Sequence, residues 1–343
     1  MTLSVFFLGA TGYIGGAVLL AIKRAHPEFR YTALVRSEKD AAAVQATGVS
    51  VITGSMDDRD LIASAAASHD ITLNAADSDN LPFALAVLAA QKKRAAAGGH
   101  VRPIFLHTSG TSVVSDPPTG KFEEAARKIW NDNNPDDIAS IAPGQPHRHV
   151  DIELFNAGES GEISTYIIAP SAIYDVAYSN PKSKVSIQIP RLVRTGLKKR
   201  QGVIIGEGTN VWSNVNIHDL TELYVLILDH ALKENAHPAP PANKFANFFF
   251  ASADEHAWGD VARLIAKSLH ARGLVNSPDP VTIQPAEGYL RPLSNNSRSV
   301  SERGRALGWV PRHRSIAEAL EDDIDAVLEA DGRNYLRNET ENT

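Results

Sequence analysis

The chain has 343 residues, no cysteine, and 34 lysines and arginines against 40 aspartates and glutamates, which gives a formal net charge of −6. The lack of cysteine excludes disulfides, thiolate nucleophiles and cysteine-ligated metal sites. The mildly negative charge argues against a nucleic acid held directly by a basic surface. No secretory signal precedes the first strand, and no apolar run approaches the ~20 residues of a membrane span. We therefore expect a cytoplasmic protein with no membrane segment.

The strongest local pattern is VFFLGATGYIGGAVLLAIKRAH, at residues 5–26. An apolar run ends at Gly9 and an apolar-periodic segment resumes after Gly15, which predicts a strand, a glycine turn and a helix. Gly9 allows the tight turn, Gly12 lets the backbone approach a pyrophosphate, and Gly15 lets the helix lie close on the strand. The N-terminus of that helix then binds the phosphate. A plain glycine-rich turn is the alternative.

The second predicted strand, at residues 31–36, ends at Arg36. In dinucleotide-binding folds, an acidic residue about 20 positions beyond the glycines holds the ribose 2′-hydroxyl, whereas an arginine there accommodates a 2′-phosphate. Arg36 and Ser37 occupy this position, and Glu38 follows them. Because a guanidinium binds phosphate bidentately, the sequence favours NADP(H) over NAD(H). A solvated arginine at a strand end is the alternative.

Helices and strands then alternate along the chain. Helices are expected at residues 37–48, 57–69 and 81–97, and strands at residues 49–53, 70–76 and 103–110. Ligands of doubly wound sheets lie at the carboxyl ends of the strands, so Asn74, Ala75 and Ala76 are expected beside the cofactor riboses. Asp57, in the acidic first turn of its helix, is the expected adenine contact.

The second half of the chain is organised differently. Turn signals dominate residues 112–146, and a connection of this length is either a lid over the substrate or a surface elaboration. Beyond it, we expect a helix at 149–158, a strand at 164–174, an amphipathic helix, two short strands, a long helix from Asp219, an apolar strand and further helices. We assign residues 1–175, with 207–235 returning, to a dinucleotide-binding domain, residues 176–206 and 236–330 to a substrate-binding region, and 331–343 to a tail.

The motif GATGYIGG, at residues 9–16, resembles the nucleotide fingerprint of the extended and atypical short-chain dehydrogenase/reductases, which include sugar-nucleotide epimerases and NmrA-like proteins. The stretches IFLHTSGTSVV, TYIIAPSAIYD and GEGTNVWSNVNIHDLTELYVLILDHAL fit the same family in the same order. The resemblance covers roughly residues 1–330. It implies an α/β fold with a doubly wound parallel sheet (Rossmann) and a smaller C-terminal substrate-binding region.

The turn pattern and the resemblance together predict the cofactor contacts. These are Gly9, Thr11, Gly12, Tyr13, Ile14, Gly15, Arg36, Ser37, Asp57, Asn74, Ala75, Ala76, Thr108, Pro170 and Ile173. The expected cofactor is NADP(H), and the expected partner is a small-molecule substrate. No metal site is expected.

The catalytic motif of the family is missing from its expected place. Members of the family exchange a proton through a tyrosine whose pKa is lowered by a lysine four residues later on the same helix face. At the start of the helix after the fifth strand this chain has PHRHVDIELFNAG, where His147, His149 and Asp151 stand nearest. The serine or threonine that usually assists is displaced, because Gly110 falls at its position with Thr111 beside it.

Three residues are candidates for the proton donor: Thr111, His149 and Tyr178. Histidine suits general acid work because its unperturbed pKa lies near 6.5, although a capping or surface histidine is the alternative. Tyr178 begins the one Tyr-x-x-x-Lys of the chain, but Pro181 interrupts it, so we interpret the match as chance and leave a loop contact with substrate open. A metal site at His147, His149 and Asp151 is not expected, because side chains on every second residue at a helix start seldom meet at one metal ion.

Three function classes stay open, because fold alone does not give function. The favoured one is an NADP(H)-dependent oxidoreductase acting on a small organic carbonyl, imine or sugar-like substrate. The second is an NmrA-like regulator that binds the dinucleotide and a protein partner and catalyses nothing. The third is a non-redox isomerase or cyclase in which the bound cofactor shapes the pocket. A Ser/His/Asp hydrolase has no support, since no G-x-S-x-G follows a strand.

Overall fold

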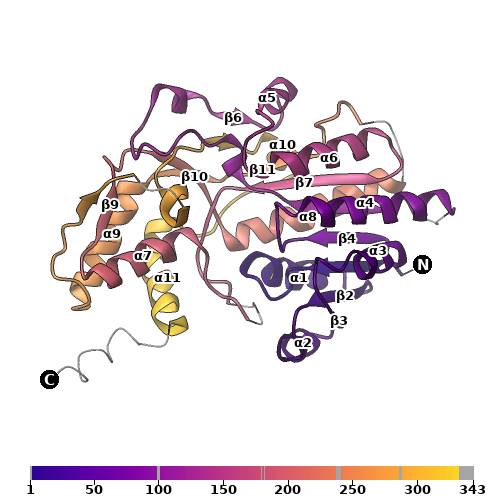
Figure 1. The fold of residues 1–343 in the computed structure, drawn as a ribbon, viewed down its shortest axis with the longest axis horizontal. Helices are drawn as coiled ribbons and strands as arrows, with labels where there is room; N and C mark the ends of the chain where they lie inside the picture. Colours follow the sequence, from indigo (N-terminus) through magenta and orange to yellow (C-terminus); the bar gives the residue numbers. More distant parts are fainter. Residues whose placement is uncertain are drawn as a thin grey trace.

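A seven-stranded sheet organises the molecule (Figure 1), and its strand order is β11-β7-β5-β4-β1-β2-β3. The computed structural model describes residues 2–98, 101–178, 180, 182–236, 241–285 and 288–331. The strands are β1 (Ser4–Leu8), β2 (Arg30–Val35), β3 (Ser50–Thr53), β4 (Ile71–Asn74), β5 (Ile104–Thr108), β7 (Ser164–Pro170) and β11 (Phe248–Ala251). All neighbouring strands run parallel. The predicted doubly wound parallel sheet is therefore confirmed.

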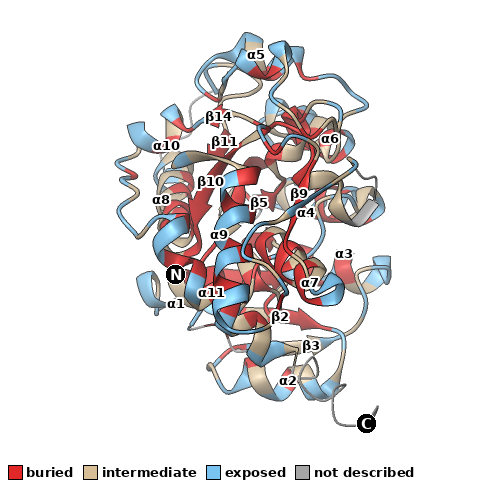
Figure 2. Ribbon diagram, turned by 90° about the vertical axis from the view of Figure 1, so that its left-hand side faces the viewer, coloured by how far each residue is buried: buried red, intermediate tan, exposed pale blue. Residues whose placement is uncertain are grey.

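Helices cover both faces of this sheet. The first face carries α1 (Tyr13–Ala25), α2 (Glu38–Gln45) and α8 (Ile217–Ala236), and the second carries α3 (Arg59–Ser68), α4 (Leu81–Ala96) and α6 (Arg148–Glu159). Successive side chains of a strand point to opposite faces, so Val5 and Phe7 pack in one core while Phe6 and Leu8 pack in the other. Figure 2 shows the buried residues following the strands. In the part of the chain that the structure describes, no helix has both the length and the apolar character needed to cross a membrane.

A smaller region stands beside the carboxyl ends of the central strands, on the left in Figure 1. A three-stranded sheet is formed by β8 (Ala172–Tyr174), β10 (Val211–Asn216) and β12 (Asp254–Ala257), and β9 (Val203–Ile205) pairs with β13 (Val281–Ile283). Three helices pack there: α7 (Gln188–Lys199), α9 (Trp258–Ala271) and α11 (Ile316–Ala330). Their apolar faces form a third core, separate from the two cores of the main sheet.

The connection at residues 112–146 is fastened to the C-terminal part of the chain. It contains two 3-10 helices, η1 (Thr111–Val114) and η2 (Glu124–Arg127), the short strand β6 (Trp130–Asn131) and α5 (Pro135–Ser140). Strand β6 pairs with β14 (Ser299–Val300), which lies between η3 (Gly288–Leu293) and α10 (Glu302–Ala306). The N–H of Gly120 also donates to the carbonyl of Ser294 over 2.6 Å. Main-chain bonds thus hold this connection against residues 294–299.

Two sequence-based boundaries differ from the structure. The apolar strand β11 joins the main sheet beside β7, and Trp309 packs in the core under α1 and α8, although we assigned residues 236–330 to the substrate-binding region. A uniformly apolar strand does not reveal its neighbours. The predicted strand at 164–174 is two strands that belong to different sheets, β7 and β8. Of the predicted tail at 331–343, only Asp331 lies within the described residues, and Pro181 lies outside them.

Candidate functional site

The glycine turn between β1 and α1 has the geometry of a phosphate cradle. Gly9 has φ +90°, and a Cβ there would lie 2.4 Å from the carbonyl oxygen of Ala75. A Cβ on Gly15 would lie 2.1 Å from the carbonyl oxygen of Gly9, so the helix rests directly on the turn. Gly12 is the N-cap of α1, and the first turn carries no capping side chain and no acidic residue. The positive end of α1 is therefore left for an anion.

A cavity of about 320 Å³ opens beside this turn, at the carboxyl ends of β1, β2 and β4. Its walls include Thr11, Arg36 and Asp57. The carboxylate that sequence reasoning left as a competitor, Glu38, accepts a hydrogen bond from Thr53 Oγ1 at 3.0 Å and is not part of the cavity wall. Arg36 thus lines the cavity, while the Glu38 carboxylate is turned to β3.

A second cavity of about 450 Å³ adjoins the first and shares Gly12, Ala75 and Ala76 with it. The main sheet and the smaller region both contribute walls, among them Ile173 and Trp212. Two buried hydroxyl oxygens of its wall residues, Thr111 Oγ1 and Ser186 Oγ, have no hydrogen-bond partner within the described residues. Because buried polar atoms normally have partners, these two hydroxyls fit a polar ligand in the cavity.

Most predicted cofactor residues meet at these two cavities. The walls contain Gly9, Thr11, Gly12, Tyr13, Ile14, Arg36, Asp57, Ala75, Ala76, Pro170 and Ile173. Four predicted contacts do not line either cavity. Ser37 caps α2 by accepting the Asp40 N–H, Thr108 is bonded to the hydroxyl of Tyr224 at 2.6 Å, and Gly15 packs on the turn.

The fourth residue outside the walls is Asn74, which we predicted beside the riboses. Its Nδ2 donates to the carbonyl oxygen of Asp77 and its Oδ1 accepts from the N–H of Ala76. The side chain is fully buried and shapes the loop after β4. Asn74 therefore holds the backbone of Ala76, which is a wall residue, and does not itself line either cavity.

The three predicted catalytic residues lie in different places. Thr111 lines the larger cavity. His149 is exposed, lies outside both cavity walls, and its Nε2 bonds to the carbonyl oxygen of Asp79 at 3.0 Å. Tyr178 is 58% exposed, and its hydroxyl donates to Asp322 on α11 over 3.1 Å, away from the glycine turn. Of the three, Thr111 alone is placed to touch a ligand.

The first turn of α6 faces the cavity wall with groups that the sequence analysis did not select. Ser109, a wall residue, donates its hydroxyl to Asp151 Oδ2 at 3.1 Å. Burial raises the pKa of Asp151 to about 7, although the Ser109 bond and the nearby Arg148 act to lower it. His147 and Asp151 are four residues apart, so they share one helix face. The four-residue spacing of His147 and Asp151 is the feature of the sequence that could have pointed to this pair.

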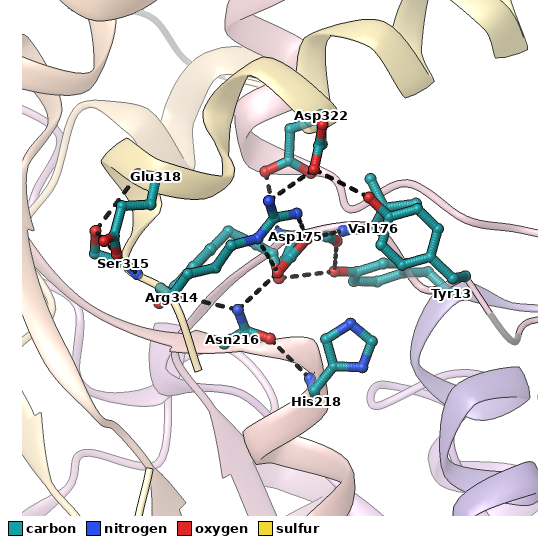
Figure 3. Close-up of polar contacts among 12 residues, drawn as sticks. Tyr13, Asp175, Val176, Asn216, His218, Arg314, Ser315, Glu318 and Asp322 are labelled. Carbon is teal, nitrogen blue, oxygen red and sulfur yellow. Dashed lines mark hydrogen bonds and ion pairs between the residues drawn. The ribbon is translucent and has the colours of Figure 1, made fainter. Parts of the chain in front are cut away.

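A buried polar cluster ties the glycine turn to the C-terminal helix (Figure 3). The Tyr13 hydroxyl donates to the carbonyl oxygen of Asp175 at 2.6 Å. The Asp175 carboxylate accepts from Nε and Nη2 of Arg314 at 2.9 and 2.6 Å, and from Asn216 Nδ2 at 2.9 Å. Arg314 also pairs with Asp322 on α11. Burial acts to raise the pKa of Asp175, but its bonds outweigh burial and hold that pKa below its ordinary value.

A second contact reaches the turn itself. The side-chain amide of Asn180 donates to the carbonyl oxygens of Gly12 and Tyr13, at 2.7 and 3.1 Å. Burial raises the pKa of Tyr13 well above its ordinary value, so its hydroxyl stays protonated and serves as a hydrogen-bond donor. Tyr13 and Asn180 thus fix the turn against the smaller region of the molecule.

Comparisons with known proteins agree with this architecture. The sequence profile of the NmrA-like family matches residues 1–96. An Acremonium protein named oxidase UcsJ is 30% identical over 340 residues, which cover 94% of this chain and 96% of that protein. A dTDP-glucose 4,6-dehydratase from Streptomyces venezuelae, solved with NAD, has a TM-score of 0.68 at 16% identity, with 96% and 98% of the two chains covered. A UDP-glucose 4-epimerase from Thermotoga maritima, solved with UDP-glucose, has a TM-score of 0.64 at 14% identity, with 95% and 99% covered.

Proposed function

Because the chain belongs to the NmrA-like family and has the fold of the extended short-chain dehydrogenase/reductases, we propose that it is an NADP(H)-dependent oxidoreductase acting on a small organic substrate. One observation carries the proposal: two cavities meet at the glycine turn and share Gly12, Ala75 and Ala76. One cavity suits an adenosine phosphate, and the other suits a nicotinamide with a substrate beside it. The Acremonium relative named an oxidase supports the same reaction class.

The residues of the turn fit a dinucleotide. The pyrophosphate would lie at the N-terminus of α1, where Gly9 and Gly12 let the backbone come close and no acidic side chain repels it. Adenine would lie between Arg36 and Asp57, and the nicotinamide would enter the larger cavity past Ala76. When bound, the cofactor supplies or accepts a hydride, and the protein supplies orientation, exclusion of water and proton exchange.

The choice of NADP(H) rests on Arg36. Arg36 lines the smaller cavity, where a 2′-phosphate would lie, while Glu38 bonds to Thr53 and does not line that cavity. A carboxylate that holds a ribose 2′-hydroxyl would repel a phosphate at the same place. Arg36 is the one cation among the described wall residues, beside the carboxylates of Asp57 and Asp77, and the absence of Glu38 from this wall supports the phosphorylated cofactor.

The larger cavity supports a small, moderately polar substrate. Its volume of about 450 Å³ falls within the range of small-molecule sites. Its wall combines the apolar side chains of Ile173 and Trp212 with the hydroxyl-bearing residues Thr111 and Ser186, which suits a substrate with a carbonyl, imine or hydroxyl group. A regulator that only reports dinucleotide binding needs no such built pocket, so this cavity favours the oxidoreductase.

The test combines binding with turnover. Calorimetric titration of the purified protein with NADPH should show saturable binding, tighter than that of NADH. The NADPH-saturated protein, offered a panel of small carbonyl and imine compounds, should oxidise the cofactor with at least one of them, followed at 340 nm. Tight binding without any turnover would favour the regulator or the isomerase. Absence of NADPH binding would overturn the assignment of the glycine turn.

A further inference from the structure

His147 is held in one orientation at the N-terminus of α6. It is the N-cap residue, with φ 66° in the left-handed region. Its N–H donates to Asp79 Oδ1 at 3.1 Å, and its ring Nδ1 lies 2.9 Å from the same oxygen and 3.0 Å from Ser78 Oγ. Because a carboxylate only accepts, the Nδ1 that faces Asp79 carries the hydrogen. Nε2 is therefore the nitrogen that gains or loses a proton.

Nε2 of His147 lies directly beside Gly110, a wall residue of the larger cavity, although His147 is not itself a wall residue. A Cβ on Gly110 would lie 3.2 Å from Nε2, closer than ordinary contact. Glycine at this position therefore lets the imidazole pack against the turn that also carries Thr111. Across the described part of the chain, Nε2 has no hydrogen-bond partner. The imidazole side chain is 17% exposed, so it exchanges protons with water.

We propose that His147 is the catalytic residue that exchanges the substrate proton, and that Asp79 positions it. This inference rests on the proposed oxidoreductase function, and it assigns to His147 the role that we expected of His149. The geometry separates the two histidines, because Nε2 of His147 lies beside Gly110 of the cavity wall while Nε2 of His149 is bonded to the main chain of Asp79.

The proton balance of the reaction follows from this geometry. In the reducing direction, bound NADPH would supply a hydride to the carbonyl carbon of the substrate, and Nε2 of the His147 imidazolium would give its proton to the carbonyl oxygen. An alcohol, NADP⁺ and a neutral imidazole result, and the imidazole regains its proton from water. In the oxidising direction, neutral Nε2 takes the hydroxyl proton of the alcohol.

The charged and titratable groups around His147 come from three elements. Asp79 precedes α4, His107 is on β5, and Arg148 and Asp151 follow His147 on α6. Burial and the neighbouring His147 lower the pKa of His107 to about 3, so His107 is neutral at physiological pH. Of these charged groups, half-buried Asp79 is the one in direct contact with the His147 ring.

The first test compares His147 with an exposed histidine far from the cavities. His147→Asn should lower kcat about 100-fold or more, the usual contribution of a positioned general acid, whereas His270→Asn, at an exposed position of α9, should stay within about twofold of the wild type. Asparagine tolerates the left-handed backbone of residue 147, so the fold should persist. Calorimetry should show unchanged NADPH affinity in both variants. Added imidazole should restore part of the activity of His147→Gly.

Asp79→Asn tests the positioning role. Loss of the carboxylate removes the acceptor that orients the imidazole, so kcat should fall by up to about 100-fold, the effect of a misplaced catalytic group. The KM for NADPH should not change, and Asp79→Glu should keep part of the activity. An unaltered kcat in Asp79→Asn would overturn the role of Asp79.

Full kcat in His147→Asn would overturn the inference and leave the oxidoreductase assignment intact. A wild-type protein that turns over no compound of the panel would instead overturn the proposed function, and the inference with it.

Discussion

At the scale of a single residue, the proposed preference for NADP(H) depends on Arg36. It is exposed at the end of β2 and borders the cavity beside the glycine turn. A charge-assisted pair between a guanidinium and a phosphate is shorter and stronger than a neutral hydrogen bond. The 2′-phosphate has no other predicted cationic partner, so the affinity difference between NADPH and NADH should depend on this side chain.

Arg36→Ala should therefore weaken NADPH binding about 10- to 100-fold, corresponding to the ~1.5–3 kcal/mol of a charged hydrogen bond. NADH affinity should change little. Lys39→Ala is the matched control, because Lys39 is an exposed cation on α2 that does not border the cavity. Calorimetric titration of both nucleotides into the three proteins measures the effect. Equal NADPH affinity in wild type and Arg36→Ala would show that the phosphate is bound elsewhere.

The residues that sequence reasoning could place are those whose role depends on their immediate neighbours. Gly9 and Gly12 were predicted because a strand end, a turn and a helix start are local features. Ser109 and His147 were not selected, because their partners Asp151 and Asp79 lie 42 and 68 residues away in the chain. The fold alone brings these pairs together.

At the scale of elements, α11 carries a buried carboxyl against the end of β8. Asp323 is fully buried, and its Oδ2 accepts the N–H of Asp175 at 3.0 Å. Burial, with the nearby Asp175 charge, raises the pKa of Asp323 to about 7. In the unfolded chain an aspartate titrates near pH 3.9. Between about pH 4 and pH 7 the folded protein therefore holds a proton that the unfolded chain has released, so stability falls as pH rises.

Asp323→Asn should remove this part of the pH dependence. The amide oxygen can still accept the Asp175 N–H, so the contact should persist. Urea unfolding followed by circular dichroism at pH 5 and pH 8 should show a smaller loss of stability in the variant than in the wild type. Asp325→Asn, at an exposed position of α11, should keep the wild-type pH response. An identical loss in wild type and Asp323→Asn would place the titrating group elsewhere.

Helices and strands whose apolar residues recur in a regular pattern could be predicted from the sequence. Strands that form only because they pair with a distant segment could not. The strands and helices of the main sheet carry apolar patterns of sufficient length, as in β1 and α4. Strand β6 has two residues and exists because β14 lies beside it. The polar strand β12, DEHA, pairs with β10 despite a sequence without strand character. In both cases tertiary contacts override local preference.

At the scale of the whole molecule, the C-terminal part of the chain completes the core of the dinucleotide-binding half. Trp309 is 1% exposed and packs with residues of β1 and α1. Its indole Nε1 donates to the carbonyl oxygen of Asp219 on α8 over 2.8 Å. Strand β11 extends the main sheet at the opposite end from β3. The two regions therefore share one hydrophobic core and one sheet, and they should unfold together.

Trp309→Ala should cost about 3–5 kcal/mol, the usual effect of removing a large buried aromatic side chain. Thermal unfolding followed by circular dichroism should show one transition at lower temperature, and NADPH should raise the midpoint of that same transition. Val310→Ala, at a neighbouring side chain that is 61% exposed, should leave the midpoint close to that of the wild type. Two separate transitions in Trp309→Ala would show that the regions fold independently.

The position of Trp309 also bears on how fast the chain can fold. Trp309 and β11 pack in the same core as β1 and α1, from which they are separated by most of the sequence. Contacts between such distant segments require the closure of long loops before they stabilise the fold. The dinucleotide-binding half should therefore fold slowly compared with a domain of the same size whose contacts are local.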